Sequence, residues 1–227
     1  MALFGLVHGG CHGAWCWDLL VPELRSRGHD AIAVDLPAED ASAGAREYAA
    51  VVAAGLDGAD AVVLVGHSIG GLTIPLVPAL RPVARLVYLC AVIPEPGRSL
   101  ADQFQTDPDL SPIRHAGVSH DSGRIVFSRR AAIDLFYHDC DPAVAAWAAS
   151  RVRPQAATPT TETTPLEARP DVPSSYILCT GDRAVNPTRS RALARDRLGV
   201  SAIELPGGHS PFLSRPAVLA HVLAGLA

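Results

Sequence analysis

Three polar side chains have the types that nucleophilic catalysis needs: Ser68, Asp182 and His209. A serine hydroxyl is a weak nucleophile until a base takes its proton, and imidazole can accept and return that proton near neutral pH. An aspartate on the other ring nitrogen would fix the tautomer and stabilise the imidazolium that forms. If these residues meet in space, they could transfer an acyl group through a covalent serine intermediate.

The serine lies in a turn between a strand-like and a helix-like segment. Residues 61–65 read AVVLV and are followed by GHSIGG at 66–71. A glycine two residues before the serine, and another two after it, removes Cβ atoms that would collide in a sharp strand-turn-helix. This pattern predicts that the Ser68 hydroxyl is raised above the end of a sheet. The alternative is a plain surface turn with an idle serine.

The aspartate and the histidine also follow strand-like segments. Asp182 comes shortly after SSYILCT, and His209 comes after SAIEL. Because the carboxyl ends of parallel strands meet at one edge of a sheet, the loops that follow them should converge there. A helix-capping or turn role for Asp182 is the alternative, with Asp35 and Glu95 as other acids that follow strands.

Acyl transfer also needs donors for the negative charge that develops on the substrate carbonyl oxygen. Backbone amides aimed at that position serve best. We predict an oxyanion hole made by the N–H groups of Ile69, directly after the serine, and Gly10, in the loop after the first strand.

The same loop contains four side chains that can bind zinc: His8, Cys11, His12 and Cys16. Cys11 and His12 are adjacent, however, and no second Cys/His pair lies nearby in the sequence, whereas structural zinc sites draw paired ligands at wider spacing. We therefore predict no metal at these residues. His12 is expected to pack or hydrogen-bond beneath the oxyanion loop.

The hydrophobic pattern predicts an α/β fold with a mostly parallel six-stranded sheet flanked by helices. Strands are expected at 2–7, 30–34, 61–65, 86–92, 174–180 and 201–205, and helices at 15–27, 43–57, 69–80, 187–197 and 214–226. Pro75 and Pro78 lie inside the third of these helices and should bend or end it.

The alternation of strands and helices is interrupted once, between about 95 and 172. We predict that residues 1–94 and 173–227 form the core and that 95–172 form a helical lid inserted after the fourth strand. Helix-like pieces occur at 129–137 and 142–152, and PQAATPTTETTP reads as a loop.

Composition and charge limit which cellular compartment and which binding partners are expected for this chain. The formal net charge is −4, no basic run occurs and the chain contains no lysine, so neither nucleic acid nor a membrane is an expected partner. The apolar runs are too short to span a membrane, and MALFGLVHGG reads as the first strand rather than a signal peptide. Five cysteines cannot all pair, which favours reduced thiols and a cytoplasmic location. A homodimer is one of the states that the sequence allows.

Several motifs together carry a family resemblance. The segments are VHGGCHGAWCW (7–17), GHSIGG (66–71), CTGDRAV (179–185), the late His209, and FYHDCDP (136–142) with RPQ (153–155) in the insertion. With the chain order Ser-Asp-His, they resemble the α/β-hydrolase branch that contains plant methylesterases, hydroxynitrile lyases and small bacterial esterases.

The resemblance implies a compact hydrolase with a helical lid, no cofactor, and a preference for esters of small, largely apolar acids or alcohols. Hydroxynitrile lyases of this branch carry a threonine and a lysine where this chain has Gly9 and Ser210, so ester hydrolysis through an acyl-enzyme is favoured. The alternatives are a lyase or acyl transferase with the same site, or a small-molecule binding protein with negligible turnover. Aromatic residues of the insertion are candidates for the pocket or for plain core: Phe104, Phe127, Phe136, Tyr137 and Trp147.

Overall fold

A six-stranded parallel sheet forms the centre of the computed structural model, which describes residues 1–60, 62–111, 118–121 and 123–227. The spatial order is β2-β1-β3-β4-β8-β9, and every neighbouring pair is parallel. The predicted α/β fold is therefore confirmed. The strands span Leu3–Val7 (β1), Asp30–Val34 (β2), Val62–His67 (β3), Val83–Leu89 (β4), Ser174–Cys179 (β8) and Ile203–Leu205 (β9).

Two strands differ from the sequence prediction in a way that matters for the site. β3 runs on through Gly66 and His67, so it delivers the chain directly to Ser68. Ala61, where we expected β3 to begin, lies outside the described residues. β4 was predicted at 86–92 but ends at Leu89, because Cys90 takes a positive φ of 46° and leaves the strand.

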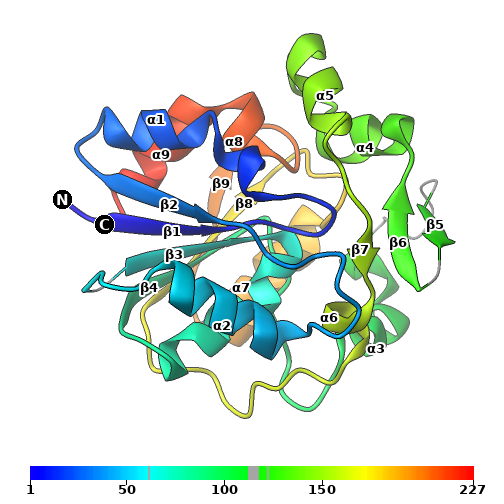
Figure 1. Ribbon diagram of the computed structural model, residues 1–227, viewed down its shortest axis with the longest axis horizontal. Helices are drawn as coiled ribbons and strands as arrows, with labels where there is room; N and C mark the ends of the chain where they lie inside the picture. Colours follow the sequence, from blue (N-terminus) through cyan, green and yellow to red (C-terminus); the bar gives the residue numbers. More distant parts are fainter. Residues whose placement is uncertain (61, 112–117, 122) are drawn as a thin grey trace.

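Helices cover both faces of the sheet (Figure 1). One face carries α1 (Leu20–Arg25) and α9 (Pro216–Ala224), which contact each other, and the other carries α2 (Ala45–Gly55) and α7 (Pro187–Leu198). Each face buries its own apolar cluster, including Leu20 and Leu219 on one side and Val52 and Ala194 on the other. No helix within the described ranges has the length and apolar character needed to cross a membrane.

The predicted helix at 69–80 is wrong in type. The chain there forms two 3-10 helices, η2 (Ser68–Leu72) and η3 (Ile74–Ala79). Pro75 and Pro78 have no N–H to donate to the carbonyl four residues earlier, so an α-helical ladder cannot form. The predicted helix at 15–27 is split into η1 (Ala14–Trp17) and α1. The predicted helix at 214–226 corresponds to α9, and a separate helical turn, α8 (Pro211–Ser214), precedes it.

Residues 95–172, here called the insertion, place their helices and strands beyond the carboxyl ends of the central strands, at the opposite end of the molecule from both termini (Figure 1). The coil that follows the last of these helices runs back along the molecule to the start of β8. The insertion is not wholly helical, because it also contains a three-stranded antiparallel sheet, β5-β6-β7. Its elements are α3 (Leu100–Thr106), η4 (Pro108–Leu110), β5 (Val118–Asp121), β6 (Arg124–Phe127), α4 (Arg129–Phe136), α5 (Pro142–Ala149), β7 (Gln155–Ala156) and α6 (Thr158–Thr161). The predicted loop PQAATPTTETTP thus holds a short strand and a helical turn.

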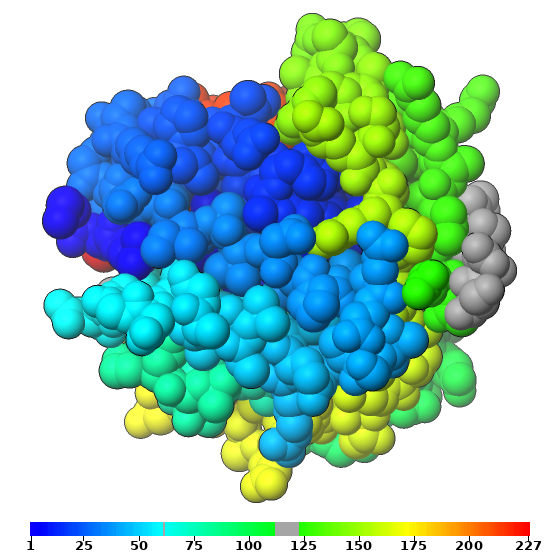
Figure 2. Space-filling model, in the orientation of Figure 1, coloured from blue at the N-terminus to red at the C-terminus, as the bar shows by residue number. Residues whose placement is uncertain are grey.

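The insertion packs directly on the first part of the chain. Figure 2 shows its yellow-green segment lying against the blue N-terminal residues. Backbone hydrogen bonds join them, from Ala156 N to Ala38 O (2.7 Å) and from Arg153 N to Cys11 O (3.0 Å). The insertion therefore reaches the two loops that follow β1 and β2.

Candidate active site

Ser68 occupies a strained turn at the end of β3. Its φ is +54°, in the left-handed region that residues with a Cβ seldom adopt. A Cβ at Gly66 would lie 2.8 Å from Ile74 Cγ2, and one at Gly70 would lie 2.9 Å from the His8 carbonyl oxygen. The two flanking glycines therefore allow the close approach that this turn needs, as the motif predicted.

His209 and Asp182 form a buried hydrogen-bonded pair. The Nδ1 of His209 lies 2.8 Å from Asp182 Oδ2, and the side chains are 1% and 3% exposed. The other carboxylate oxygen, Oδ1, accepts from the N–H groups of Ala184 (2.7 Å) and Val185 (3.0 Å). Because a carboxylate only accepts, Nδ1 carries the proton and Nε2 keeps its lone pair, which is the tautomer of a general base.

The competing acids have other partners. Glu95 Oε2 pairs with Arg197 (2.7 Å) and Arg98 (3.3 Å). Asp35 is about half exposed and pairs with Arg153 at 3.0 Å. The structure thus brings Asp182, and neither of these carboxylates, to the imidazole of His209.

The loop after β1 holds the predicted oxyanion donor at Gly10. Gly10 and Ile69 both border the cavity at Ser68, and a Cβ at Gly10 would lie 3.1 Å from Ile69 Cδ1. Ile69 is in the first turn of η2, where a backbone N–H has no helical carbonyl partner. Gly10 and the Ile69 side chain therefore lie close together at the cavity of the serine, and the role of their N–H groups as oxyanion donors stays a prediction.

Two buried histidines hold the Gly9 and Gly10 carbonyls of this loop. His8 Nδ1 donates to Gly9 O (2.8 Å), while its Nε2 accepts from Leu36 N (3.0 Å). His12 Nδ1 donates to Gly10 O (2.7 Å). Burial lowers the pKa of His8 to about 4 and that of His12 to about 3, so both rings are neutral near pH 7. The expected role of His12 beneath the loop is confirmed.

A third buried histidine, His67, contacts both the backbone and the ring of His209, the proposed base. Its Nε2 donates to the backbone carbonyl of His209 (2.9 Å), and the two ring centroids are 4.5 Å apart. Burial, followed by repulsion from His209 and His12, lowers the pKa of His67 well below its usual value. Sequence reasoning missed this contact, although the GHS triplet placed His67 next to the serine.

The RPQ segment of the insertion clamps the loop after β1 from outside. Arg153 Nε donates to His12 O (2.8 Å), and its guanidinium also reaches Leu36 O (2.9 Å). Gln155 accepts from Cys11 N (3.4 Å), at a residue with a positive φ of 61°. The resemblance flagged these residues, but nothing in the spacing predicted what they contact.

Ser68 and His209 border a cavity of about 340 Å³ with mostly apolar walls. Its polar wall side chains bond to the protein itself: Gln155 Nε2 to Tyr48 Oη (3.1 Å) and Thr160 Oγ1 to Ala157 O (2.8 Å). Within the part of the chain that the structure describes, the walls carry no Asp, Glu or Arg. The lining residues are Gly10, Cys11, Ser68, Ile69, Leu100, Ala101, Phe104, Ser111, Ile125, Phe127, Phe136, Gln155, Thr160 and His209.

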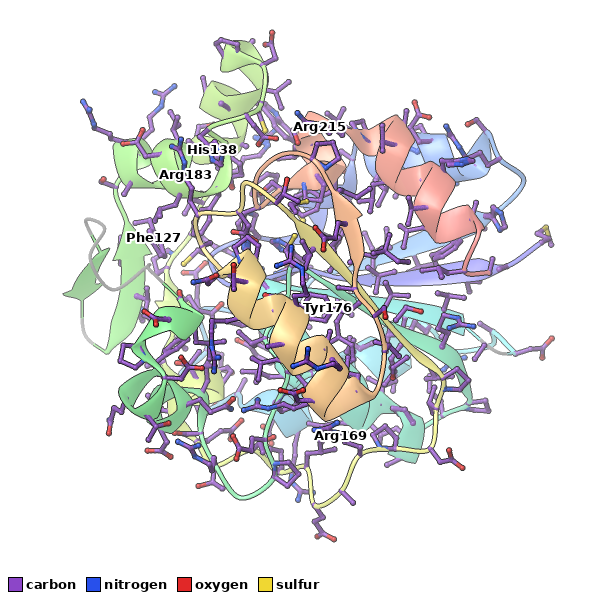
Figure 3. The ribbon with its side chains drawn as sticks, turned by 180° about the vertical axis from the view of Figure 1, so that it is seen from behind. Phe127, His138, Arg169, Tyr176, Arg183 and Arg215 are labelled. Atoms are coloured by element: carbon purple, nitrogen blue, oxygen red, sulfur yellow. The ribbon has the colours of Figure 1, made fainter. Side chains whose placement is uncertain are left out.

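Three of the five predicted pocket aromatics border this cavity. They are Phe104, Phe127 and Phe136; Phe127, labelled in Figure 3, lies on β6 at the edge of the insertion. Tyr137 is instead fully buried, with its hydroxyl 2.8 Å from His12 Nε2. Trp147 packs edge-on against Trp15 at 5.3 Å between centroids. The contacts of Tyr137 and Trp147 fit the alternative that these side chains belong to the hydrophobic core and not to the pocket wall.

The two histidines considered as zinc ligands, His8 and His12, form other contacts. Both ring nitrogens of His8 and of His12 take part in the hydrogen bonds given above. A different group, formed by Cys90, Asp182 and His209, has ligand atoms within 4.8 Å of one another. The side-chain hydrogen bond that Cys90 shares with Cys179, together with burial, raises the pKa of Cys90 well above its usual value, so its thiol keeps its proton near neutral pH.

Comparisons with known proteins agree with this architecture. A family model described as "Alpha/beta hydrolase family" matches residues 6–222. Salicylic acid-binding protein 2 from Nicotiana tabacum is 27% identical over 99% of this chain and 96% of its own length. Polyneuridine aldehyde esterase from Rauvolfia serpentina is 39% identical over 48% of this chain and 46% of its own length. A crystal structure of polyneuridine aldehyde esterase superposes with a TM-score of 0.83 at 23% identity, covering 100% of this chain and 99% of that one.

The resemblance predicted from the motifs is thereby confirmed. Because the family model and salicylic acid-binding protein 2 extend over the central sheet and the insertion alike, the chain belongs to the alpha/beta hydrolase family, in the branch of the plant methylesterases.

Proposed function

We propose that this protein is a serine hydrolase that cleaves carboxylic esters of small, largely apolar substrates through an acyl-enzyme. The observation that carries the proposal is the buried His209–Asp182 pair beside a strained Ser68 at the wall of an apolar cavity. Two similar proteins, polyneuridine aldehyde esterase and a methylesterase from Arabidopsis thaliana, are esterases by name, which supports ester hydrolysis here.

Each step has a residue with suitable chemistry. Ser68 attacks the ester carbonyl while His209 takes its proton, and Asp182 stabilises the resulting imidazolium. The N–H groups of Gly10 and Ile69 hold the oxyanion of the tetrahedral intermediate. His209 then protonates the departing alcohol and activates the water that releases the acid.

The cavity supports the substrate class. A volume of about 340 Å³ is at the small end of the range for ligand pockets, and the aromatic walls favour an acyl or aryl group without charge. We propose that the insertion acts as a lid, because α3, β6 and α6 supply much of the wall away from the sheet. A charged carboxylate or ammonium buried among such walls would be strongly destabilised.

Turnover of p-nitrophenyl esters tests the proposal. Wild-type protein should release p-nitrophenol faster from the butyrate than from the decanoate ester, and Ser68→Ala should abolish release, whereas Ser26→Ala, at an exposed turn, should not. A fluorophosphonate probe should label the wild type and leave Ser68→Ala unlabelled. Equal turnover by wild type and Ser68→Ala would refute the nucleophile.

The same assay separates the alternative functions. An acyl transferase would divert most of the acyl group to an added alcohol and form a new ester. A binding protein would hold the ester without release of p-nitrophenol. Either result would contradict ester hydrolysis as the main activity while leaving the fold assignment intact.

A further inference from the structure

The end of helix α4 contacts both loops that carry the site. Tyr137 and Asp139 follow this helix directly and belong to the FYHDCDP segment. Tyr137 bonds to the loop after β1, and Asp139 bonds to the loop after β9. In Figure 3, His138, which lies between them, and Arg215, which lies between α8 and α9, flank the loop that follows β9. Two residues of the insertion, only two positions apart in the sequence, therefore contact both loops that carry the site.

On the first side, hydrogen bonds connect Tyr137 to the oxyanion loop through His12. The Gly10 carbonyl can only accept, so His12 Nδ1 donates to it (2.7 Å), and Nε2 is left to accept from the Tyr137 hydroxyl (2.8 Å). Tyr137 and His12 are 0% and 1% exposed, so water cannot replace either bond. The Gly10 carbonyl therefore sets the tautomer of His12, and the tyrosine hydroxyl holds the imidazole ring that bonds to the Gly10 peptide.

On the second side, Asp139 holds the residue before the proposed base. Its Oδ2 accepts from Gly208 N (2.8 Å) and also forms an ion pair with Arg215. A Cβ at Gly208 would lie 2.6 Å from Asp139 Oδ1, so the loop rests directly on the carboxylate. Burial would raise the pKa of Asp139, but the Gly208 N–H and Arg215 outweigh it and hold the pKa below its usual range.

The loop after β1 has a backbone conformation that needs external support. Cys11, next to Gly10, has a φ of +61°, which residues with a Cβ seldom adopt, whereas glycine takes the φ of +107° at Gly207 without strain. A conformation like that of Cys11 persists when surrounding contacts hold it. A small displacement matters for catalysis, because a misplacement of about 1 Å can cost about 100-fold in rate.

We infer that Tyr137 and Asp139 are positioning residues, through which the insertion holds the oxyanion donor Gly10 and the base His209 in reacting geometry. This inference rests on the proposed function. The insertion then has a second task besides forming the cavity wall: it completes the reacting site from outside the core. We call the Tyr137–His12 hydrogen bond the first clamp and the Asp139–Gly208 hydrogen bond the second clamp. The loop after β9 is also held by a hydrogen bond from Gly181 N to Gly207 O (2.8 Å) and by His67, so loss of one clamp should impair the site without abolishing it.

Tyr137→Phe tests the first clamp by removal of one oxygen atom. We expect kcat to fall between about 10- and 100-fold with KM within about twofold of wild type. A trifluoromethyl ketone, which forms a tetrahedral adduct with the serine, should lose affinity by a similar factor. Tyr88→Phe, at another buried tyrosine in the apolar cluster on the opposite face of the sheet, is the matched control and should keep wild-type kinetics.

Asp139→Asn tests the second clamp, because it keeps the size of the side chain and removes its charge. We expect a loss of kcat between about 10- and 100-fold and a shifted or broadened downfield proton resonance of the His209–Asp182 hydrogen bond. Asp30→Asn, which breaks an exposed pair with Arg25 at the far end of the sheet, should change neither. If Asp139→Asn does not fold, Arg215→Lys, which keeps the charge and alters the geometry, takes its place.

Two outcomes would overturn the inference. One is wild-type kcat in both clamp variants, and the other is a loss of activity that disappears once the unfolded fraction is corrected by fluorophosphonate titration of competent serines. Failure of the proposed function looks different, because Ser68→Ala would then keep turnover and the probe would not label the wild type.

Discussion

Mild acid should unfold this protein because three buried histidines are held neutral in the fold. Burial lowers the pKa of His8 to about 4 and of His12 to about 3. Burial and the neighbouring rings lower the pKa of His67 well below its usual value. In the unfolded chain the same side chains regain an ordinary pKa of about 6.5.

The direction of the pH dependence follows from the protons that the chain takes up when it unfolds. A group whose pKa is lower in the folded state binds protons preferentially in the unfolded state, so its stabilising contribution is complete above about pH 6.5 and is lost as the pH falls toward the folded pKa. Each such histidine costs about 1.4 kcal/mol per pH unit in that window. Because each histidine is already half protonated in the unfolded chain at about pH 6.5, three of them together remove about 5 kcal/mol from the free energy of unfolding between about pH 6.5 and about pH 5. Domains of this kind have a total of about 5–15 kcal/mol.

Urea denaturation at a series of pH values measures this directly. Between about pH 6.5 and 5, the free energy of unfolding should fall with a slope that steepens toward about three protons as the pH approaches 5. Carboxylates with lowered pKa values, such as Asp139, lose their contribution only at lower pH, so they do not obscure the window. His12→Gln should reduce the slope by about one proton, while His221→Gln, at an exposed site, should leave it unchanged. A slope below one proton in the wild type would refute the reasoning.

Three further predictions concern the site and its support. Asp182→Asn should keep the fold and lower kcat by up to about 10⁴-fold in an ester assay. Glu95→Gln should retain most activity. If Glu95→Gln instead lost most activity and Asp182→Asn retained it, Glu95 would be the acid that supports His209. Gly71→Ala should lower the melting temperature measured by calorimetry, by an amount equivalent to about 1–3 kcal/mol, because the added methyl would press on the Val92 carbonyl oxygen; an unchanged melting temperature would contradict that packing. Phe127→Ala should enlarge the cavity and raise kcat/KM for an octanoate ester relative to the butyrate by about tenfold, and an unchanged ratio would place this side chain outside the acyl site.

Local patterns were enough to predict the bounds of four of the six central strands closely. β2 matches its predicted range, and β1, β8 and β9 differ from theirs by one or two residues, because each is a short apolar run between polar turns. The prediction failed where two local signals competed. At 69–80 the apolar spacing indicated an α-helix, but Pro75 and Pro78 removed backbone donors and the chain formed 3-10 turns.

The insertion was harder to predict because its elements are short. β7 has two residues and α6 has four, too few for a hydrophobic period to stand out from a polar loop. Their backbone also pairs with distant segments: β7 pairs with β6, and Ala156 bonds to Ala38. Such elements form because of tertiary contacts rather than local propensity.

The sequence by itself determined the serine turn, the order Ser68, Asp182, His209, and their placement after strands. These features depend on glycine, on apolar runs and on the convergence of parallel strand ends, all of which act over a few residues or follow from topology. Only the tertiary structure decided what holds them in place. The bond from Tyr137 to His12 spans 125 residues, and that from Asp139 to Gly208 spans 69. No local pattern encodes such contacts, because they depend on how the insertion folds back over the sheet.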